Sequence, residues 1–328
     1  MAAITPATST TTAAPDISAA LSNQTIPETA LISDADAATA RASVLAIDLT
    51  ASAESDITIQ EMKFHTAGVV SNNAIAGAYL VQDGQVIATY DSIAHGVIEF
   101  SGIDWVIPAG QTQTIWLAID LADGLSPGDT IGFSLDASSD ILATDATGTV
   151  VVVNGAFPMN GAVFPITSVS NPSLANLSIT PLSVGTSITV GMTNNLVASW
   201  NFTIGNDDAV LEGLKLTQQG AADPSSLQNL KLFINGTQIG TTTPVLDGSG
   251  AIFFDFSNQP VNLNNGSNLV QLFADVTGSP GDDIQFEIFN PYDVFVVDKS
   301  YDAPIAGQAD PGTDISIPAG TLIITPAR

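Results

Sequence analysis

Aspartate is the residue whose pattern in this sequence could do chemistry. It stands in two adjacent pairs, Asp207-Asp208 after Asn206 and Asp282-Asp283 after Gly281, both in turn-like stretches. Hard cations such as Ca²⁺ take carboxylate, amide and backbone carbonyl oxygens, which such loops supply. We therefore take Asp207, Asp208, Asp282 and Asp283 as candidate calcium ligands, although none belongs to an EF-hand loop pattern. The alternative is that these carboxylates accept hydrogen bonds within their own turns.

Asparagine offers a second kind of candidate site, because Asn-x-Ser/Thr sequons are acceptors for glycosylation in exported proteins. The candidates are Asn23, Asn176, Asn201 and Asn265, and a further sequon starts at Asn235. Asn235 is the least suited of these, because it stands in a tight Asn-Gly turn.

Catalytic patterns are missing from the sequence. It has no cysteine and two histidines, His65 and His95, neither of which stands in a metal-binding or triad spacing. With 33 acidic residues, some pair of carboxylates will have the separation of a glycosidase pair by chance. Pairs of acidic residues are therefore not evidence for a glycosidase. We expect that the chain is not an enzyme and that any cofactor is limited to calcium.

The acidic residues are also part of a duplication. A set of aspartates, a Pro-Gly-Asp turn and a phenylalanine recurs with a nearly constant offset, 153 residues for Asp129 and Asp282 (282 − 129 = 153). Self-similarity at this period indicates two copies of one module. The recurring residues are Asp120, Pro127-Gly128-Asp129, Phe133, Asp140 and Asp145, matched by Asp275, Pro280-Gly281-Asp282, Phe286, Asp293 and Asp298. Further on, Phe164-Pro165 is matched with Ile317-Pro318.

The elements that would position these residues are β-strands. Apolar runs such as residues 114–119 and 268–274 are short, rich in branched and aromatic residues, and bounded by turn residues. Asp83-Gly84 and Asn235-Gly236 each separate two apolar runs, which is the pattern of a tight β-hairpin. We predict an all-β protein of two tandem immunoglobulin-like antiparallel β-sandwich domains, residues 23–168 and 169–328, each with about seven to nine strands.

Residues 1–22 form a different kind of segment, rich in alanine, threonine and serine. This composition cannot bury enough apolar surface to order itself. We expect an extended segment that either lies on its own domain or is donated as a strand to a neighbouring subunit.

The charge balance excludes several partners. The chain has 6 basic and 33 acidic residues, a formal net charge of −27. Nucleic-acid binding and attachment to anionic lipid both need clustered cationic groups, so we expect neither. The sequence also lacks a long apolar run, so we expect no membrane insertion.

A family resemblance follows from the strand and turn motifs taken in order. The sequence resembles the immunoglobulin-like repeats of prokaryotic surface-layer and extracellular filament proteins over residues 40–328. The motifs are residues 45–50, 55–59, Gln82-Asp83-Gly84, Ile107-Pro108-Ala109-Gly110, Ile119-Asp120-Leu121 and residues 140–145. The second copy lacks the Ile-Pro-Ala-Gly motif and has Leu263-Asn264-Asn265-Gly266 at the equivalent position.

This resemblance implies a structural, self-assembling protein at the cell surface, with a homopolymer as its main partner. The alternative is a monomeric adhesin or carbohydrate-binding module that contacts surface glycans. Such a module needs an exposed aromatic platform, whereas Trp105, Trp116 and Trp200 stand in apolar strand contexts that suit core packing. The sequence therefore favours self-assembly, and it does not distinguish a filament from a lattice.

Overall fold

The computed structural model describes residues 16–24, 31–34, 37–309 and 317–327. Its regular structure is almost entirely β-strand, so the predicted all-β class is confirmed. The remaining elements are short 3-10 helices, η1 (Asn72–Ala74), η2 (Ser138–Asp140), η3 (Pro224–Ser226) and η4 (Pro291–Asp293). Across the described ranges, no helix has the length and apolar character that a membrane span requires.

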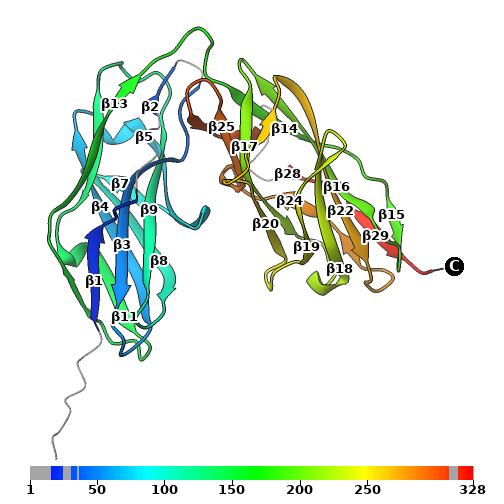
Figure 1. Ribbon diagram of the computed structural model, residues 1–328, viewed down its shortest axis with the longest axis horizontal. Helices are drawn as coiled ribbons and strands as arrows, with labels where there is room; N and C mark the ends of the chain where they lie inside the picture. The colour runs from blue at the N-terminus through cyan, green and yellow to red at the C-terminus, as the bar shows by residue number, and fades with distance from the viewer. Residues whose placement is uncertain (1–15, 25–30, 35–36, 310–316, 328) are drawn as a thin grey trace, which may run out of the picture.

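The strands separate into two groups that lie side by side along the long axis (Figure 1). We call the described residues up to Thr167 module 1, and those from Asn176 module 2. In module 1 the first sheet has the order β12-β1-β3-β9-β5-β6. Its strands are β1 (Asp16–Leu21), β3 (Ala42–Ala51), β5 (Ile75–Gln82), β6 (Gln85–Thr89), β9 (Thr112–Leu121) and β12 (Val152–Gly155).

The facing sheet of module 1 has the order β2-β13-β10-β4-β8-β7, and β11 also pairs with β4. Its strands are β2 (Leu31–Ile32), β4 (Ile57–Gly68), β7 (Ser92–Ala94), β8 (Val97–Ile107), β10 (Thr130–Leu135), β11 (Ile141–Asp145) and β13 (Met159–Thr167). Strands β1 and β2 belong to different sheets, so the start of the chain is shared between the two layers.

Module 2 repeats the first sheet strand for strand, in the order β27-β14-β16-β22-β18-β19. These strands are β14 (Asn176–Pro181), β16 (Asn195–Gly205), β18 (Leu227–Ile234), β19 (Thr237–Val245), β22 (Gly266–Val276) and β27 (Gly307–Ala309). The two hairpin turns coincide in this order, Asp83-Gly84 between β5 and β6 and Asn235-Gly236 between β18 and β19. All four turn residues have positive φ, as a two-residue hairpin of type I′ requires.

The facing layer of module 2 is divided into two sheets. One has the order β26-β25-β17-β24-β28, with β20 and β21 also paired to β17, and the other has the order β15-β29-β23. Their strands are β17 (Ala209–Gln218), β20 (Ala251–Asp255), β21 (Val261–Leu263), β24 (Phe286–Ile288), β25 (Val294–Asp298), β26 (Ala303–Ile305), β28 (Ile317–Pro318), β15 (Ser187–Thr189), β23 (Asp283–Ile284) and β29 (Leu322–Thr325).

Each module has an apolar core between its layers, because alternate residues of the strands point inward. In β22 the alternation is nearly perfect, with Val270, Leu272 and Ala274 fully buried and the residues between them partly exposed. The cores hold large aromatic side chains, Phe64 and Phe100 in module 1, Trp200 and Phe202 in module 2.

Three details differ from the sequence predictions. Residues 16–21 belong to module 1, which therefore starts before residue 23, because β1 pairs antiparallel with β3 and parallel with β12 of its own module. For these residues the alternative in which the segment lies on its own domain holds. The rest of the expected segment, residues 1–15, lies outside the described residues. The described part of module 1 contains β1 to β13, more than the expected seven to nine strands, because the chain switches between layers and breaks its edge strands into short pieces.

The third difference is a register. Ile166 donates its N–H to the carbonyl of Asp129, and Ile324 does the same to Asp282. Ile324 is therefore the structural counterpart of Ile166, and the counterpart of Phe164-Pro165 is Leu322-Ile323. The predicted match with Ile317-Pro318 is wrong, because the second copy carries extra residues before its last strand.

Candidate functional site: the junction between the modules

The two modules meet through the segment between β2 and β3, the end of β9, and strand β5 on one side. Module 2 contributes the start of β14, helix η4, and strands β25 and β26. Backbone hydrogen bonds cross this junction, since Ala40 donates its N–H to the carbonyl of Pro304 at 2.8 Å. In the linker, Val169 donates its N–H to Asp34 Oδ1 at 2.9 Å, and the hydroxyl of Tyr301 donates to the Pro172 carbonyl at 2.7 Å.

Arg41 is the central residue of the junction. Its side chain leaves module 1 and donates from Nη1 to the carbonyl of Tyr292 at 2.6 Å and from Nη2 to the carbonyl of Val294 at 2.7 Å. The guanidinium carbon also lies 3.5 Å from the centroid of the Phe295 ring, a cation–π geometry. Arg41 is 4% exposed, so these contacts are almost fully shielded from water.

The local backbone explains how Arg41 reaches its partners. Its φ of 54° lies in the left-handed region, just before β3, and turns the side chain out of the sheet. Asp120 on β9 stabilises this conformation, because its Oδ1 accepts the N–H of Arg41 at 2.7 Å. Module 2 has the same device, Asn194 with φ 53° and its N–H bound to Asp275 Oδ1. The repeated aspartates 120 and 275 therefore hold the backbone before equivalent strands.

Burial controls the electrostatics of the junction. Desolvation lowers the pKa of Arg41 to about 10, so the guanidinium stays charged at neutral pH. Desolvation also raises the pKa of Asp120, while hydrogen bonds from the Tyr79 hydroxyl and the Arg41 N–H oppose this rise. The pKa of Tyr79 is raised mainly by desolvation and then by the nearby Asp120. Tyr79 also packs against Tyr292 of module 2, with ring centroids 5.2 Å apart.

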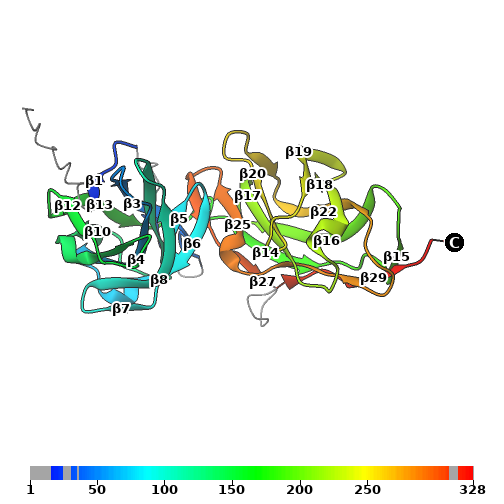
Figure 2. The same ribbon diagram turned by 90° about the horizontal axis from the view of Figure 1, so that it is seen from below.

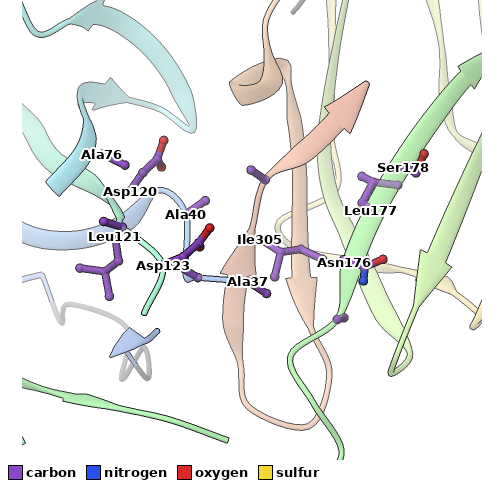
Figure 3. Close-up of a pocket in the computed structure, with 14 residues that line it drawn as sticks. Ala37, Ala40, Ala76, Asp120, Leu121, Asp123, Asn176, Leu177, Ser178 and Ile305 are labelled. Atoms are coloured by element: carbon purple, nitrogen blue, oxygen red, sulfur yellow. The ribbon is translucent and has the colours of Figure 1, made fainter. Parts of the chain in front are cut away.

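A cavity of about 450 Å³ lies beside these contacts, between the modules (Figure 3). Its walls are small or aliphatic side chains from both modules, with Asp120 and Asp123 on the module 1 side and Asn176 and Ser178 on the module 2 side. Neither a nucleophile paired with a base nor a cationic group lies in this lining. The junction therefore fixes two modules together and offers no catalytic arrangement among the described residues.

The candidate calcium ligands do not meet in one place. Asp207 and Asp208 precede β17, and Asp208 Oδ1 accepts the N–H of Asn265 at 2.8 Å. Asp283 Oδ1 accepts the N–H of Ala221, which follows the end of β17. The ten residues of β17 separate the two pairs by about 30 Å. In the described ranges no group of three or more His, Cys, Asp or Glu residues is placed to hold a metal ion.

The repeated aspartates near the ends of both modules accept hydrogen bonds from backbone N–H groups of nearby turns. Asp140 Oδ2 accepts the N–H groups of Asp136 and Ala137, and its counterpart Asp293 accepts that of Asn290. Asp145 accepts N–H groups from Thr147 and Thr149. Its counterpart Asp298 is fully buried and accepts those of Ala175, Ser300 and Tyr301.

The other predicted residues are dispersed. Asn23, Asn176 and Asn265 are exposed and Asn201 is half-buried, bonded to Thr203 and Ser267. His95 is exposed in a turn. His65 lies in β4 with Nε2 3.2 Å from Asp140 Oδ2 and Nδ1 3.6 Å from Asp136 Oδ2.

Sequence reasoning missed Arg41. The available signal was its position, 153 residues before Asn194 in the duplication, together with the scarcity of basic residues in so acidic a chain.

Comparisons with known proteins give distant likenesses. No family model matches the chain, and no curated protein matches it. Among solved structures, it is similar to the C-terminal domain of the antigen I/II-family protein AspA of Streptococcus pyogenes, with 11% identity over 93% of this chain and 98% of that chain, and a TM-score of 0.21.

Two further bacterial structures give comparable values. The C-terminal domain of the antigen I/II polypeptide BspA of Streptococcus agalactiae is 12% identical over 94% of this chain and 100% of that chain, with a TM-score of 0.21. A Corynebacterium diphtheriae protein classed as membrane anchored is 8% identical over 95% of both chains, with a TM-score of 0.22. TM-scores this low carry no inference about function.

Proposed function

We propose that the chain is a structural subunit of an extracellular filament or surface layer, in which copies are joined by strand donation. The observation that carries this proposal is an open sheet edge in module 2, at a place where module 1 is closed by a strand of its own. Such an edge is a template for pairing with another chain.

In module 1 the closing strand is β7. It pairs with the outer edge of β8, with Ile93 opposite Ile98 and Ala94 opposite Val97. The N–H of Asp91 adds a hydrogen bond to the carbonyl of Glu99 at 2.8 Å. The chain reaches this position by leaving the first sheet at the end of β6 and crossing to the facing sheet.

In module 2 the chain does not cross in this way. Strand β19, the counterpart of β6, continues to Val245, and in the described part of the chain only β17 pairs with β20 and β21, which together correspond to β8. A hollow of about 560 Å³ lies between β19 and the β20–β21 connection. Phe256, only 4% exposed, lines it, with the partly buried Ile239 and Val261 beside it.

The open edge presents backbone groups that can pair. Gln218 donates its N–H to the Gly250 carbonyl, and Phe256 donates to the Glu212 carbonyl. Because antiparallel strands alternate, even-numbered residues of β20 face β17 and odd-numbered ones face outward. Phe253 and Asp255 therefore present their N–H and C=O groups to the outer edge, where no backbone hydrogen bond from the described residues reaches them.

The occupant we propose is residues 1–15 of a second copy. These residues include no charged side chain, and residues 7–14 form a run without proline, rich in threonine, which favours strand pairing. Of the ten residues that line the hollow, Asp255 alone is charged, so an uncharged strand adds little repulsion between two chains of net charge −27. Strand β1, which these residues precede in the sequence, lies on the side of module 1 that faces away from module 2 (Figure 2).

Cysteine cross-linking tests this arrangement, because the chain has no cysteine of its own. A Thr10→Cys, Asn258→Cys double variant places one thiol in the donated segment and one beside the hollow. We expect disulfide-linked oligomers on mild oxidation, and their loss when excess synthetic peptide of residues 1–15 is added. The matched control is Thr10→Cys, Asp91→Cys, which targets the closed edge of module 1 and should give none.

Assembly itself is measured separately, by light scattering and electron microscopy of the full chain and of a chain without residues 2–15. A full chain that stays monomeric at every concentration would remove the assembly proposal. A full chain that assembles, with equal cross-linking at residues 258 and 91, would keep assembly and remove this donor arrangement.

The second candidate function is a monomeric adhesin or carbohydrate-binding module at the cell surface. One observation favours it. Trp105 and Trp200 are buried as expected, but Trp116 is half-buried and lines a hollow on the outer face of module 1. The expectation that Trp116 belongs to the core is therefore wrong.

A further inference from the structure

Trp116 lies on β9, on the side of the sheet that faces away from the core of module 1. Its neighbours Ile115 and Leu117 are buried in the core, and strand alternation places Thr112 and Thr114 on the same outer face as Trp116. Ala46 of β3 and Val81 of β5 lie directly opposite Trp116 in the register. Both are buried, so they form an apolar base beside the indole.

The hollow beside Trp116 has a volume of about 460 Å³. This size is within the range of about 300–1,000 Å³ that holds small-molecule ligands. Apart from Trp116, the residues that line it are polar residues and the glycine of the β5–β6 turn. They are Gln24, Gln82, Asp83, Gly84, Thr112, Gln113 and Thr114.

Part of this lining is already held in place by hydrogen bonds. Gln24 Nε2 donates to Thr114 Oγ1 at 3.0 Å, and Thr114 donates in turn to Asp48 Oδ1 at 2.7 Å. Thr112 shares a hydrogen bond with Thr50. The threonines are thus oriented before any ligand arrives, which lowers the entropic cost of binding. Gln82 and Asp83 also line the hollow, at the hairpin turn.

We propose that this hollow binds a neutral saccharide. A sugar ring has an apolar C–H face that packs on an indole, and a rim of hydroxyl groups that both donate and accept hydrogen bonds. Glutamine amides supply one acceptor and two donors each, and Thr114, whose proton is donated to Asp48, still offers an acceptor lone pair, so the lining can both donate to and accept from that rim. The lining has no cation, and Asp83 lies in it, so an anionic sugar is disfavoured.

Module 2 is an internal control for this proposal. In the register of the two sheets, Ala46 lies opposite Trp116 and its counterpart Ser199 lies opposite Gln271. Gln271 therefore occupies the position of Trp116 in module 2, and no aromatic side chain stands there. Phe233, directly opposite Gln271, and Phe273 form an aromatic pair on this face of module 2, so module 2 lacks the indole but not aromatic side chains. The proposed site in module 1 does not depend on strand donation.

Tryptophan fluorescence reports on binding, because Trp116 is the one tryptophan of the described chain that is not in a core. We expect a neutral-glycan array to give a hit on the full-length chain, and titration of that glycan to change the emission. The variant Trp116→Gln, which copies module 2, should abolish array binding. Gln82→Ala should weaken binding about fivefold to tenfold, the effect of one lost hydrogen bond, and Gln271→Ala should leave it unchanged.

The contrary results are equally specific. A chain that binds no neutral glycan on the array and shows unchanged emission refutes the site. Binding that survives in both Trp116→Gln and Gln82→Ala places the sugar elsewhere and also overturns the proposal. Gln82 lies at a hairpin turn, so this variant tests the site even where the tryptophan variant folds poorly.

Discussion

Replacement of Arg41 tests whether one side chain couples the two modules. Arg41→Asn is the informative change, because Asn194 occupies the equivalent place in module 2 with nearly the same φ, 53° against 54°. Asparagine accepts the left-handed backbone and keeps the N–H that Asp120 binds. The variant therefore removes the guanidinium contacts and leaves the local turn of module 1 intact.

The expected loss of stability in Arg41→Asn follows from the contacts that the guanidinium makes. Two hydrogen bonds from a charged donor contribute about 1.5–3 kcal/mol each, and a desolvated cation–π contact about 2 kcal/mol. The gain from no longer burying a charged group offsets part of this sum. We expect a net loss of about 3 kcal/mol in the free energy of unfolding of the joined modules, measured by urea denaturation.

A second assay separates coupling from folding. Ser101 and Thr241 are both exposed, one in each module. Spin labels on cysteines introduced at these positions report the distance between the modules by pulsed electron paramagnetic resonance. We expect a narrow distance distribution that broadens in Arg41→Asn. The control is Lys63→Ala, which removes the same charge from an ion pair with Glu99 whose partners are both exposed, and should change little. If Arg41→Asn behaves like Lys63→Ala in both assays, the junction is held by its backbone and aromatic contacts, and the role given to Arg41 is wrong.

Three further predictions concern the carboxylates. The raised pKa of Asp120 means that the folded chain binds this proton more readily than the unfolded chain, so its contribution to stability is present in acid and is lost as pH rises through the raised pKa. Urea unfolding between pH 7 and pH 4 should therefore show a gain on acidification that Asp120→Asn loses, and identical slopes for both chains would contradict this. Asp298→Ala leaves one buried and two partly buried N–H groups without their acceptor and should cost about 3 kcal/mol, whereas the same change at its less buried counterpart Asp145 should cost much less; thermal and urea melts of the pair decide. Calcium, if bound, is held by two separate loops, so affinity should be about millimolar and the losses in Asp207→Asn and Asp283→Asn should add; an unchanged melting temperature across a calcium and chelator series would remove the metal.

The strand class, the hairpins and the duplication could be predicted because local signals carry them. Asp-Gly and Asn-Gly turns and the alternation of strands such as residues 197–204 depend on neighbouring residues alone. Strand β1 was harder to predict, because its inward residues Ile17 and Ala19 form too short a pattern to stand out from an Ala-rich background.

Other features depend on contacts between distant residues. The partners of Arg41 lie about 250 residues away in sequence, and only the docking of two modules brings them together. Trp116 is a different case, since its strand is apolar on both faces and the sequence context resembles a core. The alternation with Ile115 and Leu117 contained the answer, because those two residues fill the inner face and leave the indole outside.

The parallel pairing of an early strand with the last strand of each module has a mechanical consequence. In module 2 the early strand β15 pairs parallel with the last strand β29, Ser187 with Ile323 through Thr189 with Thr325. When the two ends of the chain are pulled apart, parallel neighbours are dragged in opposite directions along their common axis. The hydrogen bonds between them then share the force and break together, whereas a hairpin pulled from its open end unzips one bond at a time. Strands β2 and β13 repeat this parallel arrangement in module 1, so tension along the chain meets the same kind of clamp twice.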